Sequence, residues 1–207
     1  MYIEKIQSPA DLRALDDDQL LELCEEIREF LVDAVSRTGG HLGSNLGAVE
    51  LTIAVHRIFE SPRDAIVWDT GHQAYVHKIL TGRAAEFDTL RQRHGLSGYP
   101  NPAESEHDLL ENSHASASLS WASGLATGFE LTDHQHRRVV AIIGDGSMTG
   151  GMAFEALNNL GHYGQRAVII LNDNGRSYAP TVSRLATVMS RLRQSPNYLK
   201  GRQAVTN

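Results

Sequence analysis

Short apolar runs alternate with helical periodicity along this chain, and the alternation predicts an α/β fold. The run at residues 139–143 is short and rich in β-branched side chains, which is typical of a buried parallel strand, and residues 65–69 and 167–171 form two further short apolar runs that are predicted to be strands. Between the last two runs, residues 152–160 have the pattern of a helix that opens after a Thr-Gly-Gly sequence. A strand–helix–strand crossover of this kind is almost always right-handed, so both strands should end at the same carboxyl edge of one parallel sheet.

Three further stretches are predicted to be helices that flank this sheet. In residues 16–36, apolar side chains recur every three or four positions and form one face of a helix. The side chains of this face are Leu20, Leu23, Cys24, Ile27, Leu31, Ala34 and Val35. Residues 48–59 have a similar apolar face, and residues 116–129 contain many small side chains that suit close packing against a sheet. Ser8 followed by Pro9 is typical of one more helix start.

Composition narrows the classes of protein. A chain of 207 residues fits one domain with a real core, and its formal net charge of −6 argues against a nucleic-acid partner. The single cysteine, Cys24, excludes a disulfide framework within the chain and favours a reducing compartment. No apolar run approaches the length of about 20 residues that a helix needs to span a bilayer. The start of the sequence also lacks the apolar core of a signal peptide. We therefore expect a cytoplasmic protein with no membrane partner.

The turn after residues 139–143 is both glycine-rich and acidic. Gly144 and Gly146 allow the backbone to approach a ligand closely, and the helix that follows offers N–H groups and the positive end of its dipole to a phosphate. Asp145 fits beside a phosphate if a cation lies between them, and Asn174 adds an amide oxygen; Mg²⁺ prefers such hard ligands. The sequence therefore predicts a magnesium-bridged diphosphate. The alternative is an ordinary strand-to-helix turn in which Asp145 is an N-cap.

These turns also resemble a known family. A GDG sequence with an Asn about thirty residues later resembles the thiamine-diphosphate motif. The longer stretches GDGSMTGGMAFEALNN (144–159) and LNDNGRSYAP (171–180) resemble the 1-deoxy-D-xylulose-5-phosphate synthase family, relatives of transketolase. The resemblance runs from Pro9 to about Leu185. It implies the diphosphate-binding domain of the transketolase type, with thiamine diphosphate and Mg²⁺ as cofactors.

The resemblance also implies a ligand set. Asp145, the side chain of Asn174 and the main-chain carbonyl of Arg176 would bind Mg²⁺. The residues that would approach the diphosphate through their backbone are Gly144, Gly146 and Ser147.

Two histidines lie in further glycine-rich stretches that match the family. His41, in GGHLG, would face the substrate and take part in proton transfer, which suits an imidazole because it titrates near neutrality. An ordinary loop histidine is the alternative. His72, in DTGHQAYVHKILTGR, follows the first strand and would contact the diphosphate from the same sheet edge. His72 and His77 are not spaced to share a helical face, so we do not expect a zinc pair.

A run of small residues before the 116–129 helix resembles the family's Gly-His-Ser stretch beside the cofactor. Here Ser113 replaces the Gly, His114 is retained and Ala115 replaces the Ser. The resemblance therefore implies backbone contacts with the cofactor at these positions, without a hydroxyl contact from residue 115.

For the whole enzyme, the resemblance implies a decarboxylative transfer. The family joins pyruvate to D-glyceraldehyde 3-phosphate for isoprenoid and thiamine synthesis. The Glu that activates the cofactor ring belongs to a second, pyrimidine-binding domain, which we expect to lie outside this chain together with a third domain. The chain alone should then be inactive and need a homodimer or a partner chain that carries the pyrimidine-binding domain. The alternatives are a truncated non-catalytic paralogue that acts as a binding or regulatory module, or a subunit of another transketolase-type enzyme.

Three other features have more than one possible interpretation, and a fourth has a single one. Residues 104–108 form either a solvated loop or a part of the site, and His56 is either a surface or a structural histidine. Residues 134–138 are predicted to be an exposed loop. Residues 181–207 contain five basic residues and no acidic one, which indicates either a solvated helix or an edge that meets a phosphate or an acidic partner.

Overall fold

A parallel sheet lies at the centre of the molecule. The computed structural model describes residues 1–111, 113–173, 188, 191 and 195. The sheet has three strands in the order β1 (Ala65–Trp68), β2 (Val139–Gly144) and β3 (Ala167–Asn172). Both strand pairs are parallel, with Val139 of β2 opposite the first residues of β1 and β3. The predicted α/β fold with a helix-flanked parallel sheet is confirmed.

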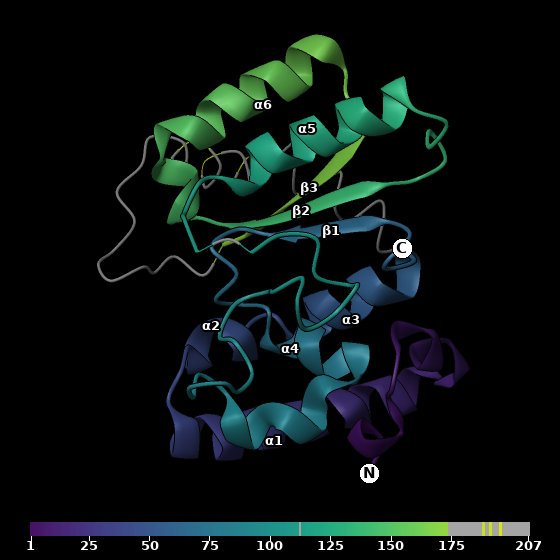
Figure 1. The fold of residues 1–207 in the computed structure, drawn as a ribbon, viewed down its shortest axis with the longest axis vertical. Helices are drawn as coiled ribbons and strands as arrows, with labels where there is room; N and C mark the ends of the chain where they lie inside the picture. Colours follow the sequence, from purple (N-terminus) through teal and green to yellow (C-terminus); the bar gives the residue numbers. More distant parts are fainter. Residues whose placement is uncertain (112, 174–187, 189–190, 192–194, 196–207) are drawn as a thin grey trace.

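Helices cover both faces of the sheet, as Figure 1 shows. On one face lie α5 (Ser118–Leu131) and α6 (Gly151–Tyr163). On the other face lie α3 (Val49–Ile58) and α4 (Tyr75–Lys78), with α1 (Asp17–Thr38) packed beyond them. This three-layer arrangement is the usual solution for a parallel sheet, which must bury both of its faces.

The side chains of β2 divide between the two faces. Val139, Ala141 and Ile143 pack in the core beneath α5 and α6. Val140 and Ile142 pack in the core on the α3 side. Successive side chains of a strand point to opposite faces. The strand is therefore apolar along nearly its whole length because neither face is in contact with water.

The first long helix is amphipathic and capped at its start. Asp16 accepts a hydrogen bond from the Gln19 amide at 2.9 Å, and the Gln19 side chain accepts one from the Asp16 amide at 3.0 Å. This reciprocal pair is a capping box. The buried residues of α1 are Leu23, Cys24, Ile27, Leu31, Ala34 and Val35, in agreement with the predicted face. No helix in the described ranges is long and apolar enough to cross a membrane.

Short helical segments connect the main elements. They are η1 (Ile3–Lys5), η2 (Pro9–Ala14), α2 (Leu42–Leu46), η3 (Ile79–Arg83), η4 (Ala84–Thr89) and η5 (Ser147–Thr149). The helix start predicted at Ser8 is confirmed as the start of η2, again with a capping box. The helix predicted from residue 116 begins at Ser118 instead, because Ser116 has a φ of +72° and cannot lie in a right-handed helix.

Candidate functional site

The loops that follow β1 and β2 meet at the carboxyl edge of the sheet. Thr70, just after β1, has its Oγ1 3.4 Å from the Oγ of Ser147, just after β2. The turn that contains His72 and the turn that contains Gly144 and Gly146 therefore lie side by side, as the strand pattern predicts. In Figure 1 this edge faces left, on the side where α2 lies.

Asp69 fastens a third segment to this edge. Its carboxylate is buried and accepts hydrogen bonds from the amides of Ser116 at 2.9 Å and Ser118 at 3.0 Å, at the start of α5. The Oγ of Ser116 also donates to the carbonyl of Ser147 at 2.5 Å. Ser116 thus joins the two turns to the segment before α5, where residues 113–115 are exposed.

The backbone is strained at two positions of this edge. Thr70 has a φ of +59° and Ser116 a φ of +72°, although neither is a glycine. A β-branched residue such as Thr is rarely found in this region, and such strain persists only where the surroundings impose it. Strained residues of this kind cluster at ligand sites, which agrees with the predicted position of the site.

The turn after β2 carries one carboxylate of the predicted magnesium-bridged diphosphate site. Asp145 is buried directly after the strand, and α6 begins a few residues later at Gly151. Gly150, the N-cap residue, has no side chain to occupy the first amides of the helix. A hard carboxylate oxygen therefore lies in the same short segment as the positive end of a 13-residue helix, which suits a cation and the phosphate that it accompanies.

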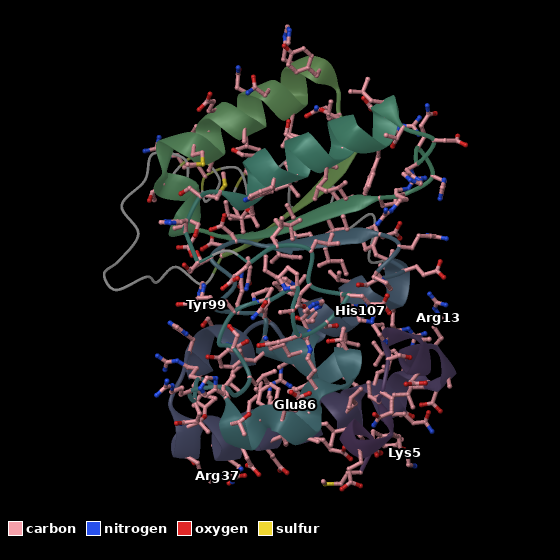
Figure 2. The ribbon with its side chains drawn as sticks, viewed as in Figure 1. Lys5, Arg13, Arg37, Glu86, Tyr99 and His107 are labelled. Carbon is pink, nitrogen blue, oxygen red and sulfur yellow. The ribbon has the colours of Figure 1, made fainter. Side chains whose placement is uncertain are left out.

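His41 and His72 are close neighbours. Their ring centroids are 5.3 Å apart in an edge-to-face arrangement. The ring of Tyr99, which is labelled in Figure 2, lies 6.4 Å from that of His41. Burial lowers the pKa of His41, and the charge of Arg91 lowers it further. Burial and then the charge of His41 lower the pKa of His72, against an opposing effect of Asp69. Both imidazoles are therefore neutral near pH 7 and can accept a proton.

Three buried polar atoms near this edge lack a hydrogen-bond partner. Within the described part of the chain, Nδ1 of His41, Nδ1 of His72 and Nε2 of Gln73 are buried without a hydrogen-bond partner. Gln73 is held through its other amide atom, since its Oε1 accepts a hydrogen bond from Asn172 Nδ2 at 3.0 Å. A buried polar group without a partner is costly, so these atoms fit a site that is completed by a polar ligand.

Part of the predicted ligand set falls outside the described residues. Asn174 and Arg176 are among these positions, so their roles stay predictions. Among the residues that are described, no group of three or more His, Cys, Asp and Glu side chains could hold a metal ion. A magnesium ion bound by Asp145 would thus require ligands of another kind, which is the arrangement that the sequence predicts.

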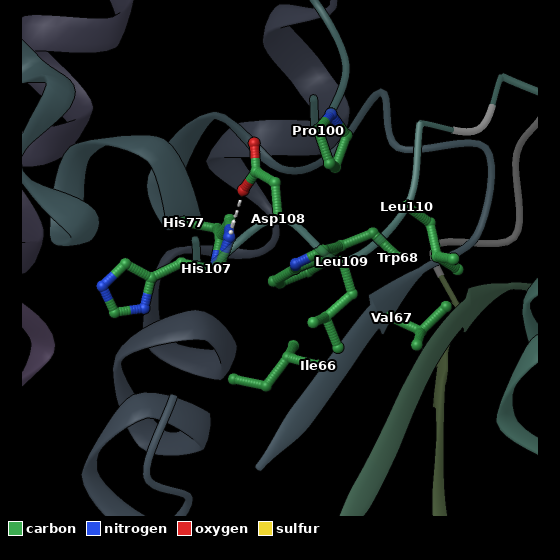
Figure 3. Close-up of a pocket in the computed structure, with 9 residues that line it drawn as sticks. All are labelled: Ile66, Val67, Trp68, His77, Pro100, His107, Asp108, Leu109 and Leu110. Carbon is green, nitrogen blue, oxygen red and sulfur yellow. Dashed lines mark hydrogen bonds and ion pairs between the residues drawn. The ribbon is translucent and has the colours of Figure 1, made fainter. Parts of the chain in front are cut away.

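The structure shows that residues 104–108 are not simply a solvated loop. Asp108 is buried and forms two hydrogen bonds with the Arg83 guanidinium, at 2.6 and 2.9 Å, and one with His77 Nε2 at 2.9 Å (Figure 3). Burial alone would raise the pKa of Asp108, but the hydrogen bonds from His77 and Arg83 outweigh burial and hold it well below its usual range. Glu104 forms an ion pair with the buried Lys78.

This ionic cluster is a structural element and not a ligand pocket. The cavity beside Asp108 in Figure 3 has a volume of about 10 Å³, enough for one water molecule at most. His56 is also structural: it is fully buried, and its Nε2 lies 2.9 Å from Nδ1 of His77. Residues 134–138 form a largely exposed turn, as predicted.

Sequence patterns did not identify several residues that shape the site. Asp69 and Gln73 lie in the stretch at residues 69–83 that resembles the family, and Asn45 lies in the loop of His41, but the sequence assigned no role to any of the three; their contribution appears only through their hydrogen bonds. Their positions in the sequence could have pointed to them, because Asp69 ends an apolar run and Asn45 lies in a glycine-rich loop.

Comparison with known proteins gives one consistent result. A family model described as 1-deoxy-D-xylulose-5-phosphate synthase matches residues 3–207. Proteins with that name are 62% identical over 95% of the chain in Corynebacterium jeikeium and 60% identical over 95% in Mycobacterium avium. Another, from Saccharopolyspora erythraea, is 60% identical over 99% of the chain. The chain spans 31%, 31% and 33% of the length of these three relatives.

Proposed function

The chain belongs to the 1-deoxy-D-xylulose-5-phosphate synthase family, and from that premise we propose that it forms the part of such a synthase that binds the diphosphate of thiamine diphosphate through Mg²⁺. The observation that carries the proposal is the place of Asp145, which is buried at the carboxyl end of β2 just before the start of α6. Ligands of parallel α/β sheets bind at this edge. A carboxylate and a helix N-terminus together suit a cation and a phosphate.

In this proposal, the two turns share the cofactor's charged end. Asp145, Asn174 and the carbonyl of Arg176 bind Mg²⁺. Gly144, Gly146 and Ser147 approach the diphosphate through their backbone. The segment at residues 113–115 lies close to the cofactor through its attachment at Ser116, which donates to the Ser147 carbonyl at 2.5 Å.

The histidines have separate roles in the proposal. His72 donates a hydrogen bond to the diphosphate, and His41 exchanges a proton with the substrate. Both roles agree with the lowered pKa values of the two imidazoles, because a neutral imidazole carries one N–H donor and one nitrogen that can accept a proton.

For the reaction, we propose the transfer that the family name implies. When bound, thiamine diphosphate supplies the carbanion chemistry by which pyruvate loses CO₂ and is joined to D-glyceraldehyde 3-phosphate. The residues of this chain bind and orient the cofactor and move protons. Because the relatives are about three times as long, we propose that residues 1–207 bind cofactor weakly by themselves and turn over no substrate without a pyrimidine-binding domain. The active form would be a homodimer or a complex with a partner chain that carries this domain.

Calorimetry tests the cofactor site directly. The purified chain is titrated with thiamine diphosphate in the presence and in the absence of Mg²⁺. We expect binding that depends on Mg²⁺ and that is lost in the variant Asp145→Ala. The matched control is Asp133→Ala, which removes an exposed carboxylate in the turn before β2.

Two outcomes would contradict this assignment. Binding of thiamine diphosphate that is independent of Mg²⁺ would show that no bridging cation is needed. Wild-type affinity in Asp145→Ala would show that a group other than Asp145 holds the cation. Synthase activity of the pure 207-residue chain would contradict the proposal that further domains are needed.

A further inference from the structure

One asparagine side chain lies between the two loops that carry His41 and His72. Asn45, in α2, is completely buried. Its Nδ2 donates to the main-chain carbonyl of His41 at 2.6 Å and to that of His72 at 2.8 Å. Its Oδ1 accepts a hydrogen bond from the amide of Tyr75 at 2.8 Å. Both Nδ2 hydrogens are used, and each is bonded to the residue whose imidazole belongs to the candidate site.

A second contact limits the movement of the His41 loop. The His41 amide donates to the hydroxyl of Tyr75 at 3.4 Å. At Gly40, a Cβ atom would lie only 2.7 Å from the same hydroxyl, so the loop already packs as closely on Tyr75 as a glycine permits. The Tyr75 ring thus packs against the loop at Gly40 and His41, and Asn45 holds the carbonyl of His41.

We propose that Asn45 is a positioning residue that sets the spacing and mutual orientation of the His41 and His72 imidazoles. It acts on the main chain at both histidines, so it fixes the base of each side chain. The consequence is the edge-to-face pair with ring centroids 5.3 Å apart. The arrangement itself is independent of any ligand. Its use, which is to present two imidazoles to adjacent parts of one cofactor–substrate complex, rests on the proposed function.

The chemistry of the side chain explains why an asparagine suits this position. Two carbonyl acceptors and one N–H donor must be satisfied by one short side chain, and an amide supplies two donors and one acceptor. An aspartate has the same shape, but its carboxylate is acceptor-only and would place an oxygen against two carbonyl oxygens. An alanine would leave the buried Tyr75 amide and the two half-buried carbonyls without the side-chain amide that now satisfies them.

Imidazole NMR on the ¹⁵N-labelled full chain tests the proposal without a ligand. The titrations of His41 and His72, assigned with His41→Gln and His72→Gln, are compared in the wild type, Asn45→Ala and Asn45→Asp. The charged groups that act on these rings are Arg91, Asp69 and the other histidine. The matched control is Thr52→Val, which removes a buried hydrogen bond to the carbonyl of Ala48, the N-cap residue of α3, and leaves the hydrogen bonds of the Asn45 side chain in place.

Loss of the asparagine amide should separate the rings. In both Asn45 variants, we expect the pKa of His72 to rise toward its ordinary value of 6.5, because it loses burial and the nearby charge of His41. The Thr52→Val titrations should match those of the wild type at a comparable loss of thermal stability. Folded Asn45 variants with wild-type titrations of both histidines would overturn the proposal.

A measurement on the wild type decides the matter if the variants do not fold. The two Nδ2 protons of Asn45 should exchange with solvent far more slowly than those of the exposed Asn158 and Asn159 on α6. Exchange as fast as in these two asparagines would show that the hydrogen bonds to His41 and His72 are absent in solution, and this would also overturn the proposal.

Cofactor titration separates this proposal from the proposed function. If the wild type binds thiamine diphosphate with Mg²⁺, Asn45→Ala should bind about 10- to 100-fold more weakly, the effect typical of residues that orient a ligand-binding side chain. Thr52→Val should bind as the wild type does. Unchanged affinity in Asn45→Ala would show that the arrangement does not serve the cofactor. Absence of binding by the wild type would contradict the proposed function only, because the NMR result stands without a ligand.

Discussion

The side chain of Ser116 occupies the space that a side chain at Gly150 would need. A Cβ atom built on Gly150 lies 1.9 Å from the Oγ of Ser116 and 2.7 Å from its Cβ. The start of α6 and the segment before α5 therefore pack against each other with no room for a methyl group. This contact lies beside the turn of Asp145, so it helps to define the candidate diphosphate site.

Gly150→Ala should accordingly destabilise the protein by about 1–3 kcal/mol, which is the usual cost of overpacking. Ser116→Gly removes both clashing atoms and suits the φ of +72° at this position. In a double-mutant cycle measured by urea unfolding, Ser116→Gly should recover most of the loss caused by Gly150→Ala. Strictly additive effects of the two substitutions would contradict this account of the contact.

The buried carboxylate of Asp108 balances the buried guanidinium of Arg83. Asp108→Asn removes the carboxylate that accepts two hydrogen bonds from Arg83 and leaves only Glu104, 3.4 Å away, as its counter-charge, so we expect the free energy of unfolding to fall by about 3–5 kcal/mol. Chemical denaturation measures the change. Glu106→Gln, an exposed position in the same loop, is the control and should change stability by less than about 0.5 kcal/mol. Equal effects of the two substitutions would show that the cluster contributes little.

Buried neutral histidines should make the protein less stable in mild acid. Burial lowers the pKa of His56 and of His77 below the ordinary value of 6.5 in the folded state. The unfolded chain then binds more protons than the folded one below about pH 6.5, so stability falls as the pH drops through this value. We expect the Tm to decrease between about pH 7 and pH 5, by about 2–4 °C for each kcal/mol lost.

His56→Gln provides the matched comparison for this pH dependence. Since it removes one of the two buried imidazoles, the decrease in Tm between pH 7 and pH 5 should be smaller than in the wild type. His134→Gln, in the exposed turn, should show the same decrease in Tm between pH 7 and pH 5 as the wild type. If the decrease in Tm over this pH range is the same in His56→Gln as in the wild type, His56 is not held neutral by burial.

The two faces of α1 can be compared with one residue type. Leu23 is fully buried, whereas Leu21 is 63% exposed. Leu23→Ala should lower the free energy of unfolding by about 2–5 kcal/mol because it leaves a cavity in the core. Leu21→Ala should change it by less than about 0.5 kcal/mol. Similar losses in the two variants would place the apolar face of α1 elsewhere.

The sequence by itself determined the framework of the protein. Three short apolar runs predicted the strands, and the residues after them predicted which turns meet at one edge. These features are local, because a strand buried on both faces must be apolar throughout and because parallel crossovers have one preferred hand. The ends of helices were less accurate: α5 begins at Ser118, since the left-handed backbone of Ser116 is not visible in the pattern.

Only the tertiary structure decided how polar side chains are paired. Asn45 joins the loops of His41 and His72, and Asp108 reaches Arg83 in the interior. These partners are far apart in the sequence, and polar residues in loops have the same composition whether they face water or each other. A buried polar group must find a hydrogen-bond partner, but which one it finds depends on how the layers pack. The sequence therefore predicted where the candidate site lies, and the packing of the loops decided which residues are paired around it.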